Sequence, residues 1–217
     1  MHSEVGIATT KGREAVLQET IKSLRNETKL NIFCDLKKGM FFNHRASWNE
    51  LFKNSEIALL LQDDISATKN WYKTCLLFAD KFPKQQIFSF YNLFGKKPPK
   101  ELNGVFLLEN GLWEQAIMIR KPLHDLLKKT LTKDMIKYRR MPKNKRRDYH
   151  HDSIVKDVLN KIKYRQMKVF PPFFQHRDEN STLGNNRTFQ GKPRQSIFYL
   201  GDDVDSFDYF SKRLEYI

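Results

Sequence analysis

Short apolar runs alternate with segments of helical periodicity through the first half of the chain. The runs with the length and composition of buried strands cover residues 4–10, 29–35, 56–64 and 85–92. The segments whose apolar residues recur at helical spacing cover residues 12–27, 46–55 and 67–82. This alternation predicts an α/β fold with a mainly parallel central sheet and helices on both faces.

The second half of the chain is less regular. An apolar stretch at 104–123 predicts one or two strands that continue up to Arg120. Helices are predicted over residues 122–131 and 150–163, and a strand is predicted from residue 165 into a polar loop. We find no internal repeat and no clear linker, so the whole chain is expected to form a single domain.

Polar residues end three of the predicted strands. In sheets of this type, ligands bind outside the carboxyl ends of the strands. The residues that the prediction brings to this edge are Thr9, Thr10, Asp35, Asp63 and Asp64. The aspartate pair follows an unbroken apolar run, where carboxylates can bind a metal ion. The pair can also be a strand end that caps the next helix, because Asp64 and Ser66 lie near its predicted start.

Net charge changes the expected partners. The chain carries 39 Lys and Arg residues against 25 Asp and Glu residues, a formal net charge of +14. The excess is concentrated in residues 128–147, which hold ten Lys or Arg and one Asp. Clustered cations gain affinity for a nucleic acid by releasing its condensed counterions, so this segment favours a polyanionic partner. A solvated loop of arbitrary charge is the alternative.

Cysteine usage and hydropathy exclude some protein classes. Cys34 and Cys75 lie in apolar contexts, are too few for a disulfide framework or a zinc site, and are expected to be buried thiols. No run of 18 apolar residues and no signal-peptide segment is found. We therefore expect a soluble protein of the cytoplasm, or of the host cytoplasm if the source is a virus.

Five stretches, in this order, resemble the GT-A family of nucleotide-sugar glycosyltransferases over nearly the whole chain. They are "VGIATTKGREAVLQETIKSL", "NHRASWNELFKNSEIALLLQDD", "GLWEQAIMIRKPL", "HHDSIVKDVLNKIKYRQMKVFPP" and "PPFFQHRDENSTLGN". They are similar to the family's first strand and nucleotide loop, its acidic metal motif, its acceptor-side strands, the helix that begins with the catalytic base, and the late loop with a metal-binding His. The resemblance implies a single GT-A-like (Rossmann-like) domain over residues 1–217. Residues 1–95 would bind the nucleotide sugar, and residues 104–217 the acceptor.

The resemblance also implies a divalent cofactor, Mn²⁺ or Mg²⁺, which neutralises charge on the departing diphosphate. Asp64 would supply a carboxylate oxygen and His176 a ring nitrogen, with Asp63 shared between the metal and the ribose. The chain departs from the family pattern at Gln62, where an acid is common. An amide is a poor metal ligand but can hydrogen-bond a ribose hydroxyl, so Gln62 is assigned to the nucleotide sugar.

Further residues are assigned to the nucleotide sugar by the same resemblance. Thr9, Thr10 and Arg13 would contact the base or the phosphates, and Asp35 the base or ribose. Arg45 could reach the diphosphate. Other roles stay open, because Thr10 can simply cap the following helix and Arg45 can be a surface cation. The donor is expected to be a UDP-sugar.

Asp152 is the candidate general base. An acceptor hydroxyl loses its proton as it attacks the anomeric carbon, and a carboxylate within hydrogen-bond reach can take that proton. With Asp152 as base the reaction inverts the anomeric centre, whereas a retaining mechanism would not need a base there, so the stereochemistry stays open. The alternative is that Asp152 or Ser153 only caps the helix that begins there.

The basic segment would approach the acceptor, which is therefore expected to be a polyanion. The acceptor-binding residues assigned within it are Arg139, Arg140, Lys143, Lys145, Arg146 and Arg147. The sharpest hypothesis is a 5-hydroxymethylpyrimidine in double-stranded DNA, as in bacteriophage DNA-modifying glycosyltransferases. A surface glycan or lipopolysaccharide is the alternative acceptor.

Three functions of other classes use the same residues. A two-metal nuclease could use the acid pair with His176, and a His-Asp phosphohydrolase could use His150, His151 and Asp152. A non-catalytic basic nucleic-acid-binding protein could stack bases on aromatic residues. The candidates for stacking are Phe41, Phe42, Tyr91 and Phe94. Metal-dependent binding of uridine diphosphate is expected of the transferase alone.

Overall fold

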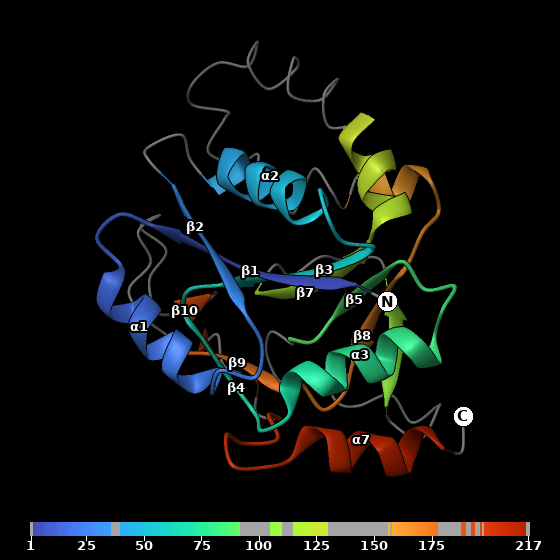
Figure 1. The fold of residues 1–217 in the computed structure, drawn as a ribbon. Coiled ribbons are helices and arrows are strands. Elements are labelled where there is room, and N and C mark those ends of the chain that lie inside the picture. Colours follow the sequence, from blue (N-terminus) through green and yellow to red (C-terminus); the bar gives the residue numbers. More distant parts are fainter. Residues whose placement is uncertain are drawn as a thin grey trace.

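Seven strands of the described part of the chain form a sheet at the centre of the molecule (Figure 1). The computed structural model describes residues 2–35, 40–91, 105–109, 115–129, 156, 158–177, 188–189, 192–193, 196 and 198–215. In spatial order the strands are β2 (Leu30–Asp35), β1 (Ser3–Thr10), β3 (Ile57–Gln62), β7 (Ala116–Arg120), β5 (Ile87–Ser89), β8 (Gln166–Val169) and β6 (Phe106–Glu109). Two short pairs lie outside this sheet: β4 (Ile65–Ala67) with β9 (Phe174–His176), and β10 (Thr188–Phe189) with β11 (Lys192–Pro193).

The strand directions make the sheet mainly parallel. β1 is parallel to both β2 and β3, and β5 is parallel to β8. β7 lies antiparallel between β3 and β5, and β6 is antiparallel to β8. In the described part of the sheet, β2, β1, β3, β5 and β8 therefore run one way and β7 and β6 the other. The predicted α/β class with a mainly parallel sheet is confirmed.

Helices cover both faces of the sheet (Figure 1). α1 (Glu14–Ser23), α3 (Trp71–Lys81) and α7 (Ser206–Leu214) pack their apolar residues on one face. α2 (Met40–Leu51) and the helical residues 121–129 and 158–161 pack on the other. Among the described helices, none combines the length and apolar character that crossing a bilayer requires.

The side chains of β3 point alternately to the two faces of the sheet, so this strand contributes to the hydrophobic core on each face. In β3, Leu59 and Leu61 enter the core under α1 and α3, while Ala58 and Leu60 enter the core under α2. An unbroken apolar run is what a strand covered on both faces requires. On β1, Gly6 is required by packing, because a Cβ there would lie 2.6 Å from the Phe33 ring.

The structure differs from the predictions in the bounds of two elements and in the burial of one cysteine. α2 begins at Met40, before the predicted start at residue 46. Residues 65–67 form β4, where the start of a helix was expected at residue 67. Cys75 is buried as predicted, but the prediction for Cys34 is wrong, because it lies on the edge strand β2 and is exposed.

His124 is a buried titratable group in the core under α2. Its side chain is 7% exposed and stacks on Phe52 with 4.5 Å between ring centroids. Burial lowers the pKa of His124 from 6.5 to about 4; the negative charge of Asp125 opposes this shift, and the positive charges of Lys128 and Lys121 add to it. The unfolded chain therefore binds a proton first as the pH falls, and this proton favours unfolding between pH 6.5 and about 4.

We predict that His124→Phe removes part of the acid sensitivity of folding. Between pH 7 and pH 5, wild type should lose about 1 kcal/mol more unfolding free energy than the variant, because at pH 5 the imidazole is protonated mainly in the unfolded chain. Urea unfolding at both pH values measures this difference. His2→Gln, at an exposed histidine, is the control. Equal pH responses of wild type and His124→Phe would contradict a buried neutral His124.

Candidate functional site

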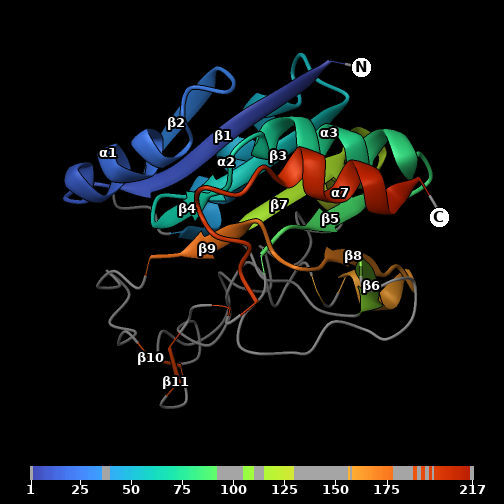
Figure 2. The ribbon, with the colours of Figure 1, turned by 90° about the horizontal axis from the view of Figure 1, so that it is seen from below.

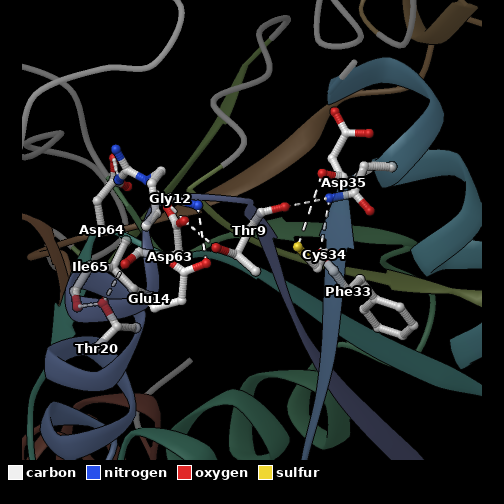
Figure 3. A network of polar contacts seen from close by, with 12 residues as sticks. Thr9, Gly12, Glu14, Thr20, Phe33, Cys34, Asp35, Asp63, Asp64 and Ile65 are labelled. Carbon is white, nitrogen blue, oxygen red and sulfur yellow. Dashed lines mark hydrogen bonds and ion pairs between the residues drawn. The ribbon is translucent and has the colours of Figure 1, made fainter. Parts of the chain in front are cut away.

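The carboxyl ends of β1, β2 and β3 lie side by side, as the sequence predicts. Thr10 and Asp35 are register partners at the ends of β1 and β2, and both are half-buried. Gln62, half-buried at the end of β3, is the register partner of Ala8. Asp63 and Asp64 follow Gln62 in the turn before β4. Figure 3 shows Thr9 between Asp63 on one side and Asp35 on the other.

A tight turn after β1 directs Arg13 toward the acid pair. Gly12 has a φ of +89°, a conformation that glycine adopts without steric cost. The backbone N–H of Arg13 donates to the Thr10 carbonyl at 3.3 Å, which closes the turn. Arg13 is the residue before α1 and therefore lies between β1 and α1. From this position its side chain reaches the acid pair at the end of β3.

Arg13 forms a buried ion pair with both aspartates. Its Nε lies 3.0 and 2.9 Å from the two carboxylate oxygens of Asp63, and its Nη2 lies 3.1 Å from Oδ2 of Asp64. The three residues are only 6–7% exposed. Charge-assisted hydrogen bonds of this kind are strong, and they satisfy carboxylates that would be costly to bury alone.

Two threonines hold the same turn. The Thr9 hydroxyl donates to Oδ2 of Asp63 at 2.5 Å. The buried Thr20 hydroxyl of α1 donates to the backbone oxygens of Asp63 and Ile65, at 2.7 and 3.0 Å (Figure 3). Thr20 is not among the predicted site residues, although it lies on the same helical face as Leu17 and Leu24. A polar residue within a buried stripe is the signal that could have identified it.

Strand pairing outside the main sheet brings His176 to Asp64. β9 pairs antiparallel with β4, so His176 is the register partner of Ile65 (Figure 2). His176 is 1% exposed, and its Nε2 lies 3.3 Å from Oδ2 of Asp64. The backbone N–H of Arg177 donates to the Asp64 carbonyl at 2.7 Å. The Arg177 side chain lies 3.6 Å from Glu19 of α1 and adds a partly exposed cation that the sequence analysis did not assign.

The Asp64–His176 pair fits two positions of a divalent ion. Neighbouring ligands of an octahedral ion with bonds of about 2.1 Å lie about 3 Å apart, close to the observed oxygen–nitrogen separation of 3.3 Å. Within the described ranges, no group of three or more His, Cys, Asp or Glu residues could hold a metal. An ion here would take its remaining ligands from substrate phosphates and water, as Mg²⁺ sites commonly do.

Asn43 connects the ends of β1 and β2. Its Nδ2 donates to the backbone oxygens of Thr9 and Phe33, each at 3.0 Å. Arg45 follows on α2 and is half-buried. The contacts of Asn43 fix the spacing between the strands that end in Thr10 and Asp35. Asn43 was missed because the predicted helix begins only at residue 46.

The electrostatics of the turn are dominated by burial. Burial raises the pKa of the Asp63 carboxyl, and the hydrogen bonds from Arg13 and Thr9 oppose this shift. The neighbouring Asp64 charge adds to the rise. Without Arg13, burial would raise the pKa of Asp63 further.

Part of the predicted site lies outside the described residues. This holds for the candidate base Asp152 and for the acceptor-binding cations of the basic segment. Those cations are Arg139, Arg140, Lys143, Lys145, Arg146 and Arg147. Their roles stay predictions. The structure brings together Thr9, Arg13, Asp63, Asp64 and His176.

The structure resembles several solved structures at a distance. No protein-family model and no curated protein matches the sequence. A197 from STIV has a TM-score of 0.48 and 10% identity, over 80% of this chain and 85% of that one. A glycosyltransferase involved in the glycosylation of the major capsid of PBCV-1 has a TM-score of 0.45 and 16% identity, over 76% of this chain and 81% of that one. The glycosyltransferase GlyE of Streptococcus pneumoniae TIGR4 has a TM-score of 0.45 and 11% identity, over 98% of this chain and 61% of that one. Likeness at this level assigns no activity.

We predict that Asp63→Asn destabilises the protein by about 3 kcal/mol, because the variant removes the carboxylate charge that the buried Arg13 Nε contacts. Urea unfolding at pH 7 measures the change. Glu50→Gln is the matched control, since Glu50 pairs with Lys53 at the surface and its loss should cost no more than about 0.5 kcal/mol. Equal costs for the two variants would contradict a buried Arg13–Asp63 pair.

Proposed function

We propose that the protein is a metal-dependent glycosyltransferase that moves a sugar from a nucleoside diphosphate sugar to an acceptor hydroxyl. The observation that carries the proposal is the contact of Asp64 with His176, 3.3 Å apart, at the carboxyl edge of the sheet. Ligands of open α/β sheets bind at this edge. The five ordered stretches of sequence resemblance support the same activity. A two-metal nuclease would need more clustered carboxylates than the described residues bring together.

The residues of the edge divide into donor-binding and metal-binding groups. Asp64 and His176 would hold Mn²⁺ or Mg²⁺, which neutralises charge on the leaving diphosphate when bound. Thr10, Asp35 and Gln62 lie at neighbouring strand ends and would contact the base and ribose of the donor. UDP-sugars are the first donors to test.

Charged residues around the edge would orient the reaction. Arg13 is held against the acid pair and would face the phosphates, and Arg45 of α2 would add a second cation. Asp152 is proposed to accept the proton of the attacking hydroxyl, as general bases do. Attack assisted in this way inverts the anomeric centre of the sugar.

The acceptor is proposed to be a polyanion. The basic segment, residues 128–147, precedes Asp152 closely in the chain and carries ten Lys or Arg against one Asp. A phosphate-rich acceptor would release counterions on meeting such a segment. DNA that contains 5-hydroxymethylpyrimidine is the first acceptor to test, and a surface glycan or lipopolysaccharide is the second.

We predict that Asp64→Ala abolishes sugar transfer and leaves the fold intact. The rate of diphosphate release from a UDP-sugar in the presence of Mn²⁺ should fall by at least about a thousandfold, the effect of losing several kcal/mol of metal-assisted charge stabilisation. Asp203→Ala removes a carboxylate that is 93% exposed and should leave the rate unchanged. Full activity of Asp64→Ala with unaltered metal dependence would exclude the assigned metal site.

We predict that charge reversal in the basic segment weakens DNA binding and flattens its dependence on salt. The variant replaces Arg139, Arg140, Arg146 and Arg147 by Glu. The slope of log affinity against log salt should decrease by roughly one for each lost phosphate contact. Fluorescence anisotropy of labelled duplex DNA at several salt concentrations measures this slope.

The matched control for this variant reverses four exposed lysines that lie on α1, on α3 or shortly after α3. They are Lys22, Lys73, Lys81 and Lys84. This control has the same net charge as the basic-segment variant, so it separates local contacts from overall charge. Equal effects of both variants would contradict a DNA contact by the basic segment, and the glycan acceptor would then be preferred.

A further inference from the structure

Arg13 already supplies a positive charge where a metal ion would bind. Its Nη2 lies 3.1 Å from Oδ2 of Asp64, and the same oxygen lies 3.3 Å from Nε2 of His176. A divalent ion bound by Asp64 and His176 would therefore share its carboxylate with a guanidinium. Two cations within a few ångströms in a buried site repel each other strongly.

The remaining contacts of Arg13 fix it in this position. Its Nε is bound to both oxygens of Asp63, at 3.0 and 2.9 Å, and Asp63 is held in turn by Thr9. A metal ion cannot remove Arg13 from the site without breaking this pair. Asp63 thus acts as the anchor of Arg13, which leaves Asp64 and His176 as the metal ligands.

The charges of Arg13, Asp63 and Asp64 favour some ligands of the site over others. Asp63 and Asp64 contribute two negative charges and Arg13 one positive charge, which leaves one net negative charge. A free divalent ion would turn this into a net positive charge inside a buried site. A diphosphate that arrives with the ion brings compensating negative charge, and Arg13 then becomes an attractive neighbour of the phosphate oxygens.

We propose, on the basis of the proposed function, that Arg13 makes the site select a metal–diphosphate complex over a free divalent ion. Arg13 weakens binding of the ion alone and strengthens binding of the ion together with the nucleotide. Thermodynamic linkage requires the effect to be mutual, so the ion must raise the affinity for the diphosphate by the same factor. Arg13 is thus a specificity determinant, and Asp63 and Thr9 position it.

The test measures binding of Mn²⁺ and of uridine diphosphate separately, without turnover. Electron paramagnetic resonance gives the Mn²⁺ affinity with and without saturating uridine diphosphate, and titration calorimetry gives the nucleotide affinity. In wild type, the nucleotide should tighten Mn²⁺ binding by at least about tenfold. Arg13→Gln should bind Mn²⁺ alone about tenfold more tightly than wild type, and the nucleotide should add much less to its affinity.

Two further variants separate charge from other effects. Arg13→Lys retains the positive charge and should bind Mn²⁺ alone as weakly as wild type does. Arg213→Gln removes an exposed arginine of α7 and should leave both affinities unchanged. Thermal unfolding of each variant checks that the fold is retained.

The outcomes distinguish this inference from the proposed function. If wild type binds uridine diphosphate but its Mn²⁺ affinity is independent of the nucleotide, the inference is overturned and the transferase proposal stands. A folded Arg13→Gln with the Mn²⁺ affinity of wild type overturns it in the same way. If wild type binds neither Mn²⁺ nor the nucleotide, both proposals fail. Because the wild-type comparison needs no variant, loss of folding in Arg13→Gln leaves the inference testable.

Discussion

Two adjacent carboxylates buried at the end of a central strand require a positive charge beside them, and Arg13 supplies it. Removing a carboxylate from water costs several kcal/mol unless a partner replaces the lost hydration. The turn at Gly12 and the placement of Arg13 at the start of α1 meet this requirement. Thr9 of β1 and Thr20 of α1 also donate hydrogen bonds to Asp63. Polar contacts therefore join β1, α1 and the end of β3.

The pairing of β4 with β9 adds chemistry to this unit. It brings His176 from late in the chain to the carboxylate of Asp64. The hydrogen bond from the Arg177 backbone to Asp64 fixes the same junction. The carboxylate and the imidazole can bind a divalent cation, and the neighbouring guanidinium can bind an anionic diphosphate. The proposed selection of a metal–diphosphate complex follows from the coexistence of these groups.

The sequence was most informative where one physical requirement dominated. The apolar run of β3 had to be covered on both faces, so the sheet and its carboxyl edge could be predicted. The family resemblance also predicted that Asp64 and His176 lie close together, although no local sequence pattern indicates that two residues so far apart in the chain are neighbours. The internal role of Arg13 could not be predicted, because an arginine after a strand is usually solvated. The role of Asn43 could not be predicted, because a side chain that hydrogen-bonds backbone oxygens leaves no periodic hydrophobic pattern in the sequence. The exposure of Cys34 could not be predicted, because its apolar neighbours do not show that the strand lies at the edge of the sheet.

Anomalous diffraction from crystals grown with Mn²⁺ and uridine diphosphate tests the proposed metal site most directly. We expect a manganese peak within bonding distance of Asp64 and His176, with the diphosphate on the ion and Arg13 still bound to Asp63. A manganese peak at another site, or a nucleotide bound away from the ends of β1, β2 and β3, would contradict it. The same map would show whether the Arg13–Asp64 contact persists beside the ion.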